Sequence, residues 1–342
     1  MSRCDIAVVI PTFNRANDLQ AVLTAVLDQD AGDVTYEVLV VDNNSTDETA
    51  AVVQRAVMAD TTGVLRYAFE RRRGVSHARN TGVAMTTAPV ILFIDDDCVP
   101  GRDWVRTMKD AFDAHPDVHC IGGRLKAEWR VPPPTWMGPR LTGPIALQDR
   151  PSPTYVSAQS ASVCLLTANL GIRRTAFEQV GGFSPDYPRG QDREMQMRMW
   201  RAGLQGLYLP AMDVTVPIPQ ERMTRRYHRR WYATTAKFHA RMRFRDCVDA
   251  NGVLHENPRG ARLGGSPLFL YREWLTHLIG WVGNALTLRH DARFYHETRL
   301  WYGVGFFITR WRDRRPVRAA VDRRSGGVTK DRNSSIRALP AR

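Results

Sequence analysis

Residues 90–97 read VILFIDDD, an apolar run that ends in three consecutive aspartates. Two earlier segments, DIAVVIPTFNR (5–15) and YEVLVVDNNS (36–45), likewise pass from apolar residues to polar ones. Continuous apolar runs of this length are typical of buried strands in a parallel sheet. Because ligands of such sheets bind beyond the carboxyl ends of the strands, the three polar clusters should form one site.

Helical patterns separate these strands, at about residues 17–28, 45–57 and 75–86. In the second of them, Ser45 or Thr46 is placed to cap the amino end. Strands that alternate with helices of this length predict an α/β fold, Rossmann-like, with a mostly parallel sheet, flanking helices and right-handed crossovers.

The bulk composition is that of a globular protein, with 43% hydrophobic and 24% charged residues in a chain of 342. The five cysteines are odd in number and lack paired spacing, which argues against a disulfide framework or a zinc site. The chain opens without a basic, then apolar, leader pattern. We therefore expect a cytoplasmic location.

The charge is unevenly distributed, since residues 221–342 hold 26 of the 48 Lys and Arg but only 10 of the 35 Asp and Glu. We expect a catalytic domain over 1–215, a basic and mainly helical extension over 216–320, and a disordered tail over 321–342. In the extension, apolar aromatic stretches lie between arginines and are too interrupted to span a membrane. They fit either peripheral contact with anionic lipid on the inner face of the cell membrane or simple packing on the catalytic domain. We expect no nucleic-acid partner, because no nucleic-acid module is recognisable.

The aspartates after the 90–94 run are the strongest chemical signal. Three adjacent carboxylates repel one another unless they share a cation. In an extended chain Asp95 and Asp97 point to the same side, which suits two oxygen ligands for Mg²⁺ or Mn²⁺. The alternative is a solvated acidic turn before the helix that begins near Trp104.

Other polar residues have two interpretations each. Asp42 either accepts a hydrogen bond from a base or ribose or forms an Asx turn. Arg79, inside the third helix, either contacts phosphate or lies on a solvated face. Asp192 opens a helix in the segment GQDREMQMRMWRAG (190–203), where an acidic residue is commonly a cap but is also held in one orientation.

Six segments in order, VVIPTFNR, VVDNNSTDET, GVSHARNTG, FIDDDCVP, ANLGIRRTAFEQVGGF and GQDREMQMRMWRAG, resemble the family-2 glycosyltransferases, which have the GT-A fold. The resemblance covers roughly residues 5–205. It implies a nucleotide-sugar half over 1–100 and an acceptor half over 101–215.

The resemblance also implies residue roles. Asp97 is the principal metal ligand, with Asp95 on the metal or the ribose, and Asp192 is the general base that deprotonates the acceptor hydroxyl. The expected donor-binding residues are Pro11, Thr12, Asn14, Arg15, Asp42, Arg79, Asp95 and Asp96. The expected acceptor-region residues are Gly181, Gly182, Gln191 and Trp104.

Two positions depart from the family pattern. Gln191 precedes Asp192 where relatives often have Glu, so a charge beside the base is absent. Many relatives place a His after the base helix, whereas here His228 is the first histidine, and water is a better third metal ligand than that residue.

The expected function is inverting transfer of a sugar, a UDP-sugar favoured, to a hydroxyl of a surface glycan or a lipid-linked acceptor, with Mn²⁺ or Mg²⁺ as cofactor. Two alternatives stay open. A non-catalytic nucleotide-sugar-binding scaffold would have no need of the three aspartates. A nucleotidyltransferase would be expected to carry a Gly-rich phosphate loop, which PTFNRAND (11–18) lacks.

Overall fold

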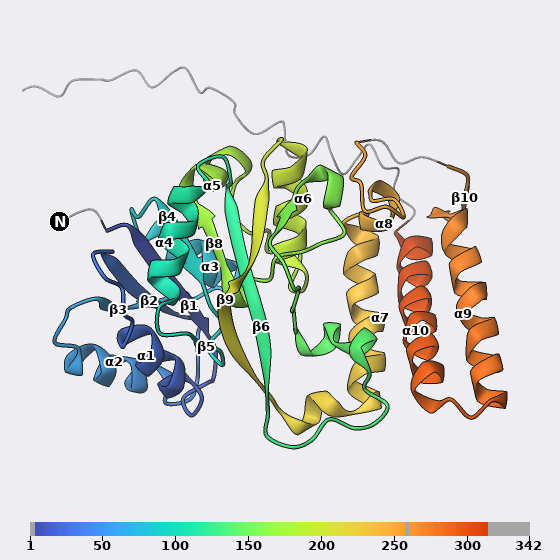
Figure 1. Ribbon diagram of the computed structural model, residues 1–342, viewed down its shortest axis with the longest axis horizontal. Helices are drawn as coiled ribbons and strands as arrows, with labels where there is room; N and C mark the ends of the chain where they lie inside the picture. The colour runs from blue at the N-terminus through green and yellow to red at the C-terminus, as the bar shows by residue number, and fades with distance from the viewer. Residues whose placement is uncertain (1–3, 257–259, 314–342) are drawn as a thin grey trace, which may run out of the picture.

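The structure is a computed structural model that describes residues 4–256 and 260–313 (Figure 1). Within that part, a nine-stranded sheet has the order β3-β2-β1-β4-β8-β6-β9-β5, and β7 pairs with β9. The strands are β1 (Ile6–Thr12), β2 (Tyr36–Asp42), β3 (Leu65–Phe69), β4 (Val90–Phe93), β5 (Val99–Pro100), β6 (Cys120–Trp129), β7 (Thr154–Val156), β8 (Leu170–Arg173) and β9 (Gly206–Ile218).

The amino-terminal half of the sheet is parallel, as the apolar runs predict. Strand β1 pairs in parallel with β2 and β4, and β2 pairs in parallel with β3. Thr12 lies opposite Asp42 at the ends of β1 and β2, so two of the predicted polar clusters leave the sheet at the same level. Strand β8 then runs antiparallel to both β4 and β6, which makes the sheet mixed.

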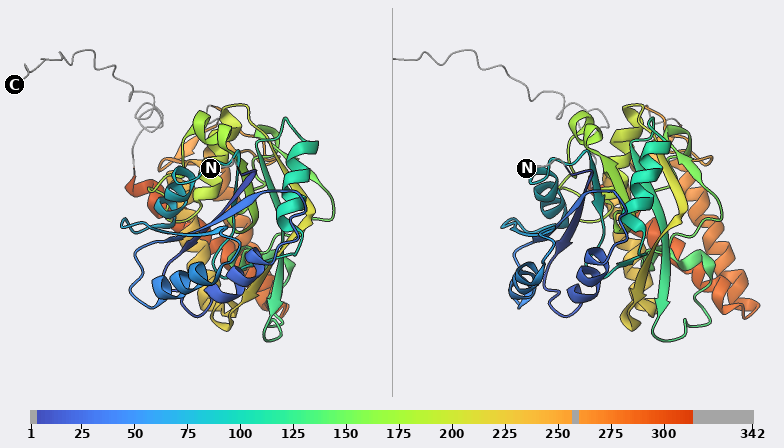
Figure 2. Two further views of the ribbon diagram at one scale, coloured as in Figure 1. Left: turned by 90° about the vertical axis from the view of Figure 1, so that its left-hand side faces the viewer. Right: turned by 60° about the vertical axis from the view of Figure 1, so that its left-hand side comes forward.

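Helices cover both faces of this sheet (Figure 2). Alternate residues of β1 divide between two apolar clusters: Ile6, Val8 and Ile10 enter one, and Val9 enters the other. The first cluster includes residues of α1 (Leu19–Leu27), α2 (Thr49–Ala59) and α4 (Trp104–Ala114). The second includes residues of α3 (Val75–Ala84), α5 (Arg174–Val180) and α6 (Gln191–Arg201). The predicted α/β architecture is thereby confirmed.

The predicted cap of the second helix is wrong. Helix α2 begins at Thr49, and Asp47 rather than Ser45 or Thr46 accepts from the Thr49 backbone N–H at 3.0 Å. Ser45 Oγ instead accepts a hydrogen bond from the Asn14 N–H at 3.0 Å. The side chains of this turn therefore hold the β1 loop to the β2 loop.

The Pro-rich stretch between β6 and β8 is ordered around short 3₁₀ turns. These are η1 (Pro139–Leu141), η2 (Gly143–Ile145), η3 (Ala158–Ser160) and η4 (Thr167–Asn169). Tyr227 donates a hydrogen bond to the Pro144 carbonyl at 3.3 Å, which joins this excursion to the carboxyl-terminal helices.

The carboxyl-terminal region is helical, and α10 packs between α7 and α9 (Figure 1). Its elements are η5 (Gln220–Met223), α7 (Arg225–Arg241), α8 (Phe244–Cys247), β10 (Arg262–Leu263), β11 (Ser266–Pro267), α9 (Leu268–Leu286) and α10 (His290–Arg312). Buried Asp246 pairs with Arg262 at 2.7 Å and Arg310 at 2.8 Å, so an ion cluster joins α8, β10 and α10. In the described residues, no helix is both long and apolar enough to cross a membrane. The predicted disorder of 321–342 concerns residues outside the described part.

Candidate active site

A cavity of about 450 Å³ opens at the carboxyl ends of β1 and β4. Its lining comes from both strand ends, from the loop before α3 and from the loop before α6. The lining residues are Pro11, Thr12, Phe13, Arg15, Asn43, Arg73, Gly74, Val75, Asp95, Asp96 and Pro188. Five predicted donor residues are therefore together in one cavity. The sequence analysis did not select the other lining residues, which are Phe13, Asn43, Arg73, Gly74, Val75 and Pro188.

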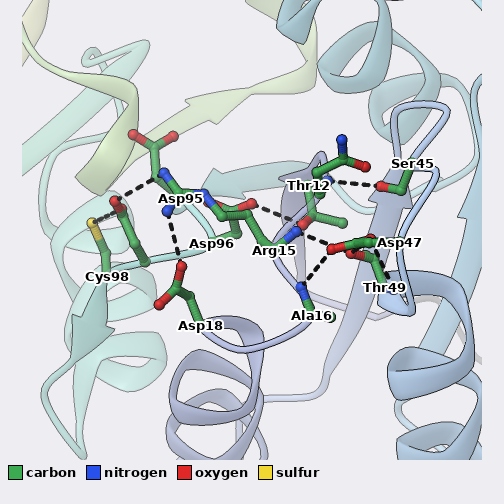
Figure 3. Close-up of polar contacts among 12 residues, drawn as sticks. Thr12, Arg15, Ala16, Asp18, Ser45, Asp47, Thr49, Asp95, Asp96 and Cys98 are labelled. Atoms are coloured by element: carbon green, nitrogen blue, oxygen red, sulfur yellow. Dashed lines mark hydrogen bonds and ion pairs between the residues drawn. The ribbon is translucent and has the colours of Figure 1, made fainter.

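Asp96 joins the β4 loop to the β1 loop (Figure 3). It accepts a hydrogen bond from Thr12 Oγ1 at 2.8 Å, and Arg15 Nε lies 3.9 Å from its other oxygen. Burial raises the pKa of Asp96 to about 7, although Thr12 and Arg15 act in the opposite direction. Asp96 thus fixes the geometry of the cavity floor.

Asp95 forms an ion pair with buried Arg79. Arg79 is 3% exposed and donates from Nη2 to Asp95 Oδ1 at 2.9 Å, while its guanidinium lies over the Phe183 ring. Withdrawal from bulk water raises the pKa of Asp95, Arg79 opposes this, and repulsion from Asp97 and Asp192 adds to it. Arg79 does not line the cavity. In the structure its ion pair is with Asp95, and the expected phosphate contact stays a prediction.

Asp97 faces two arginines from distant parts of the chain. Arg15 Nη2 lies 3.7 Å and Arg222 Nη2 lies 3.5 Å from Asp97 Oδ2. Arg222 belongs to η5. The sequence analysis missed Arg222, because nothing in its local pattern distinguishes it from the other arginines of the basic extension.

Asp95 and Asp97 are the two carboxylates of this site that could share a divalent cation with a diphosphate. In the described residues no group of three His, Cys, Asp or Glu side chains forms a complete protein cage. Mg²⁺ and Mn²⁺ sites often use only one or two carboxylates together with substrate phosphates and water. Asp95 and Asp97 repel each other in the structure, and a cation between them would relieve that repulsion.

Besides Arg79, two further expected donor residues, Asp42 and Asn14, lie outside the cavity lining. Asp42 is 1% exposed and accepts hydrogen bonds from the Ser45 N–H at 2.9 Å and the Tyr67 hydroxyl at 3.0 Å. Asn14, with φ of 52°, accepts from the Thr46 N–H at 2.8 Å. Both residues shape the loops around the cavity, and Asp42 adopts the turn alternative of the sequence analysis.

Asp192 lies in the first turn of α6, close enough to Asp95 to raise the pKa of that carboxyl. Its Oδ1 accepts the Arg193 N–H at 2.8 Å, so one oxygen is oriented by the helix start. Gly190, at φ of 75°, makes the left-handed turn that begins the helix. The base candidate and the metal candidates therefore come from opposite ends of the catalytic domain to one place.

The segment before α6 is fixed to α3 rather than free. A side chain at Gly182 would lie 2.5 Å from Asn80 Oδ1, and Asn80 bonds the Phe183 N–H and carbonyl at 2.8 Å each. Gly181, at φ of 76°, terminates α5. Gln191 Oε1 is buried and lacks a hydrogen-bond partner, so this amide oxygen is available to a ligand donor.

Burial places two of these residues in the core: Trp104, which was expected in the acceptor region, and His228, the weaker alternative to water as a third metal ligand. Trp104 is 1% exposed in the core and donates from Nε1 to Asn169 at 2.9 Å, so it cannot contact an acceptor. His228 is fully buried on α7, its ring packs against Trp136, and burial lowers its pKa to about 4. It is a core residue, and the doubt about it as a metal ligand was justified.

Arginines also gather beside the helix that carries Asp192. Arg189 stacks on Trp231 with its guanidinium carbon 5.9 Å from the ring centroid, and its buried Nη1 has no hydrogen-bond partner. Burial lowers the pKa of Arg189, and the neighbouring charges of Arg222 and Arg230 lower it further. This side of the site is therefore cationic.

Comparison with known proteins agrees with this geometry. The chain is 29% identical over 199 residues to glycosyltransferase AglE of Haloferax volcanii, an alignment that covers 58% of this chain and 62% of that one. It is 26% identical over 197 residues to the glucosyl-dolichyl phosphate glucuronosyltransferase of the same organism, covering 56% and 59%. The chain thus spans about three-fifths of the length of these curated relatives.

Among solved structures, the mannosyltransferase PcManGT of Pyrobaculum calidifontis in complex with GDP-Man and Mn²⁺ superposes with a TM-score of 0.57. The match has 20% identity and covers 92% of this chain and 87% of that one, which supports the GT-A fold. The family model for glycosyl transferase family 2 matches residues 7–181, from β1 through the first turn beyond α5. The chain belongs to glycosyl transferase family 2.

Proposed function

We propose that the protein is an inverting, metal-dependent glycosyltransferase that uses a nucleotide-diphosphate sugar, with a UDP-sugar favoured. The observation that carries the proposal is a cavity lined by Asp95 and Asp96, with Asp97 next in sequence and Asp192 close enough to raise the pKa of Asp95. The complex of PcManGT with GDP-Man and Mn²⁺ supports a nucleotide sugar and a metal, although not the choice of base.

The donor side rests on the β1 and β4 loops. Asp95 and Asp97 would hold a divalent cation, which when bound would neutralise charge on the departing diphosphate. Arg15 and Arg222 already lie against Asp97 and can turn to the same phosphates. Arg79 keeps Asp95 in place throughout.

Asp192 supplies the base. As the acceptor hydroxyl oxygen forms its bond to the anomeric carbon, Asp192 takes the hydroxyl proton and the bond from that carbon to the diphosphate breaks on the opposite face. The sugar is inverted, and the nucleoside diphosphate leaves with the bonding pair. Capping by the Arg193 N–H keeps the carboxylate oriented for this step.

The acceptor is proposed to be a glycan or lipid-linked molecule that carries an anionic group near its hydroxyl. The support is the arginine group of Arg189, Arg222 and Arg230, with one buried guanidinium nitrogen unpartnered. Arginine is well suited to phosphate because its planar fork donates two hydrogen bonds. Gln191 Oε1 could accept a hydrogen bond from the acceptor.

We place the enzyme in the cytoplasm, which the cysteines support. All five are free in the structure, and four are buried. No specific observation favours either alternative function. The cavity lining holds no Gly-rich phosphate loop of the kind expected in a nucleotidyltransferase. A non-catalytic scaffold would not need Asp192 beside the other aspartates.

The test is a thermal-shift panel of UDP, GDP, dTDP and CDP, each with Mn²⁺, Mg²⁺ or EDTA. A ligand at about 100 times its Kd adds about 2.7 kcal/mol to stability, which raises Tm by a few degrees. We expect one nucleotide, UDP, to stabilise only when metal is present. If no nucleotide raised Tm under any metal, the transferase proposal would fail, and a scaffold with a vestigial site that no longer binds nucleotide would be the better account.

A further inference from the structure

Helix α9 lies at the end of the molecule away from the sheet (Figure 1). It carries a stripe of exposed apolar side chains. Leu275, Ile279, Val282 and Leu286 are 45% to 81% exposed. Their spacing of four, three and four residues places them on one face of the helix. Within α9 only Leu270 is buried, so this helix contributes little to the core beneath it.

Helix α10 carries a second stripe of exposed apolar residues. Trp301, Val304, Ile308 and Trp311 are 37% to 60% exposed and follow a spacing of three, four and three residues. A groove of about 420 Å³ connects the two helices and is lined by Leu278 and Trp281 of α9 and by Trp301 and Val304 of α10, among others. We call these eight exposed residues of the two stripes the hairpin face.

Arginines surround the hairpin face. Arg272, Arg289 and Arg312 are exposed on or beside the same two helices, and Arg293 lies 4.8 Å over the Trp281 ring. Two of the carboxylates on these helices are paired, Glu273 with Arg245 and Glu297 with Arg229, and Asp291 at the start of α10 is exposed. The surface is therefore apolar at its centre and cationic at its margin.

We propose that the hairpin face docks on an anionic lipid surface, with α9 and α10 lying in the interface. Helices with an apolar stripe, tryptophans and flanking arginines bind at the boundary between headgroups and acyl chains. The basic residues add attraction to anionic lipid, and residues 221–342 hold 26 Lys and Arg against 10 Asp and Glu. This inference does not rest on the proposed function.

A second copy of the chain is the competing occupant. Pairing two hairpin faces would bring the arginine margins of both copies together, and like charges repel across such an interface. An anionic membrane surface instead complements both the apolar centre and the cationic margin. The charge of the margin therefore favours lipid.

The experiment is co-sedimentation of the full chain with vesicles of phosphatidylcholine alone or with about one quarter phosphatidylglycerol. We expect binding to the anionic vesicles and weaker binding to the neutral ones. Replacing Leu275, Ile279 and Val282 by serine should lower the partition coefficient about tenfold or more, because exposed apolar area is what the interface buries. Raising NaCl from about 0.1 to 1 M, which shortens the Debye length from about 10 to 3 Å, should also weaken binding.

The matched control replaces Met58 and Met85, which are 85% and 42% exposed on the catalytic domain, by serine. It should leave the partition coefficient unchanged within about twofold.

The single variant Ile279→Asp replaces the triple variant in this experiment if the triple variant does not fold. Unchanged vesicle binding in either face variant would overturn the proposal, as would wild-type protein that ignores anionic vesicles. A dimer in solution that Ile279→Asp dissociates, without vesicle binding, would assign the face to a second copy. The nucleotide thermal shift is read separately, so failure here is distinct from failure of the transferase proposal.

Discussion

Arg222 Nη2 lies 3.5 Å from Asp97 Oδ2, although 125 residues separate the two in sequence. Asp97 follows β4, and Arg222 stands in η5 after the last strand of the sheet. The segment that follows β9 therefore lies beside the aspartates that follow β4. The predicted boundary at residue 215 consequently separates Arg222 from the site to which it contributes.

The first prediction concerns this pair. Arg222→Gln removes a cation from the phosphate side of the cavity while it keeps the length of the side chain. Hydrogen bonds to charged groups contribute about 1.5–3 kcal/mol, so the Kd for UDP with Mn²⁺ should rise about tenfold or more. Isothermal titration calorimetry measures it. Arg226→Gln, an exposed arginine on α7, is the control and should leave the Kd unchanged. An unaltered Kd in Arg222→Gln would remove this residue from the donor site.

The strands and the site edge were predictable because their signals are local. The runs before Thr12, Asp42 and Asp95 are each apolar for several residues, and parallel pairing sends their ends to one edge. Pro11, Thr12, Arg15, Asp95 and Asp96 were consequently assigned to the cavity in which the structure has them.

Other features depend on contacts between distant segments, which a sequence pattern does not contain. The sequence around Trp104 has the amphipathic pattern that is common where helices begin. In the structure, packing against the sheet buries Trp104 beside Asn169. Arg222 is one of many arginines in its region, and only the path of β9 brings it to Asp97. Arg79 points into the protein because it contacts both Asp95 and the Phe183 ring there.

The packing of α3 on β1 gives a second prediction, about stability. A Cβ at Gly82 would lie 2.4 Å from Val9 Cγ1, so Gly82→Ala forces helix and strand apart. Overpacking of this kind costs about 1–3 kcal/mol in the free energy of unfolding. Gly283→Ala on α9 is the matched control, because nothing lies within 4 Å of its added carbon. That control should stabilise by about 0.5–1 kcal/mol, since alanine is the better helix former. Urea denaturation of both variants compares them, and equal effects would contradict the close contact.

A third prediction concerns pH. Glu70 accepts from Arg72 and from the Thr81 hydroxyl, and these hydrogen bonds, with Arg72 the largest influence, lower its pKa well below the ordinary value. A carboxyl whose pKa is lower in the folded state stabilises the fold above its unfolded pKa, about 4.5, and loses that contribution as pH falls below it.

Glu70→Gln should therefore lower the free energy of unfolding at pH 7 by about 1–3 kcal/mol, because it removes the buried carboxylate to which Arg72 and Thr81 donate. The deficit relative to wild type should shrink progressively below about pH 4.5. Urea denaturation at a series of pH values from about 7 to 3 measures it. Glu178→Gln, at an exposed position on α5, is the control. A deficit independent of pH would show that packing, not ionisation, gives Glu70 its effect.

The last prediction tests the base. Asp192→Asn keeps the size of the side chain and its hydrogen bond from the Arg193 N–H but cannot take a proton. General base catalysis contributes about 10²- to 10⁴-fold, so transfer should fall by that factor while the metal-dependent thermal shift with UDP persists. Asp110→Asn, at an exposed position on α4, controls for loss of a surface carboxylate and should retain full transfer. Because Asp192 lies near Asp95, removing its charge should also relieve repulsion there, so UDP binding should be unchanged or slightly tighter. Loss of nucleotide binding together with transfer would instead make Asp192 part of the donor site and leave the base to another residue.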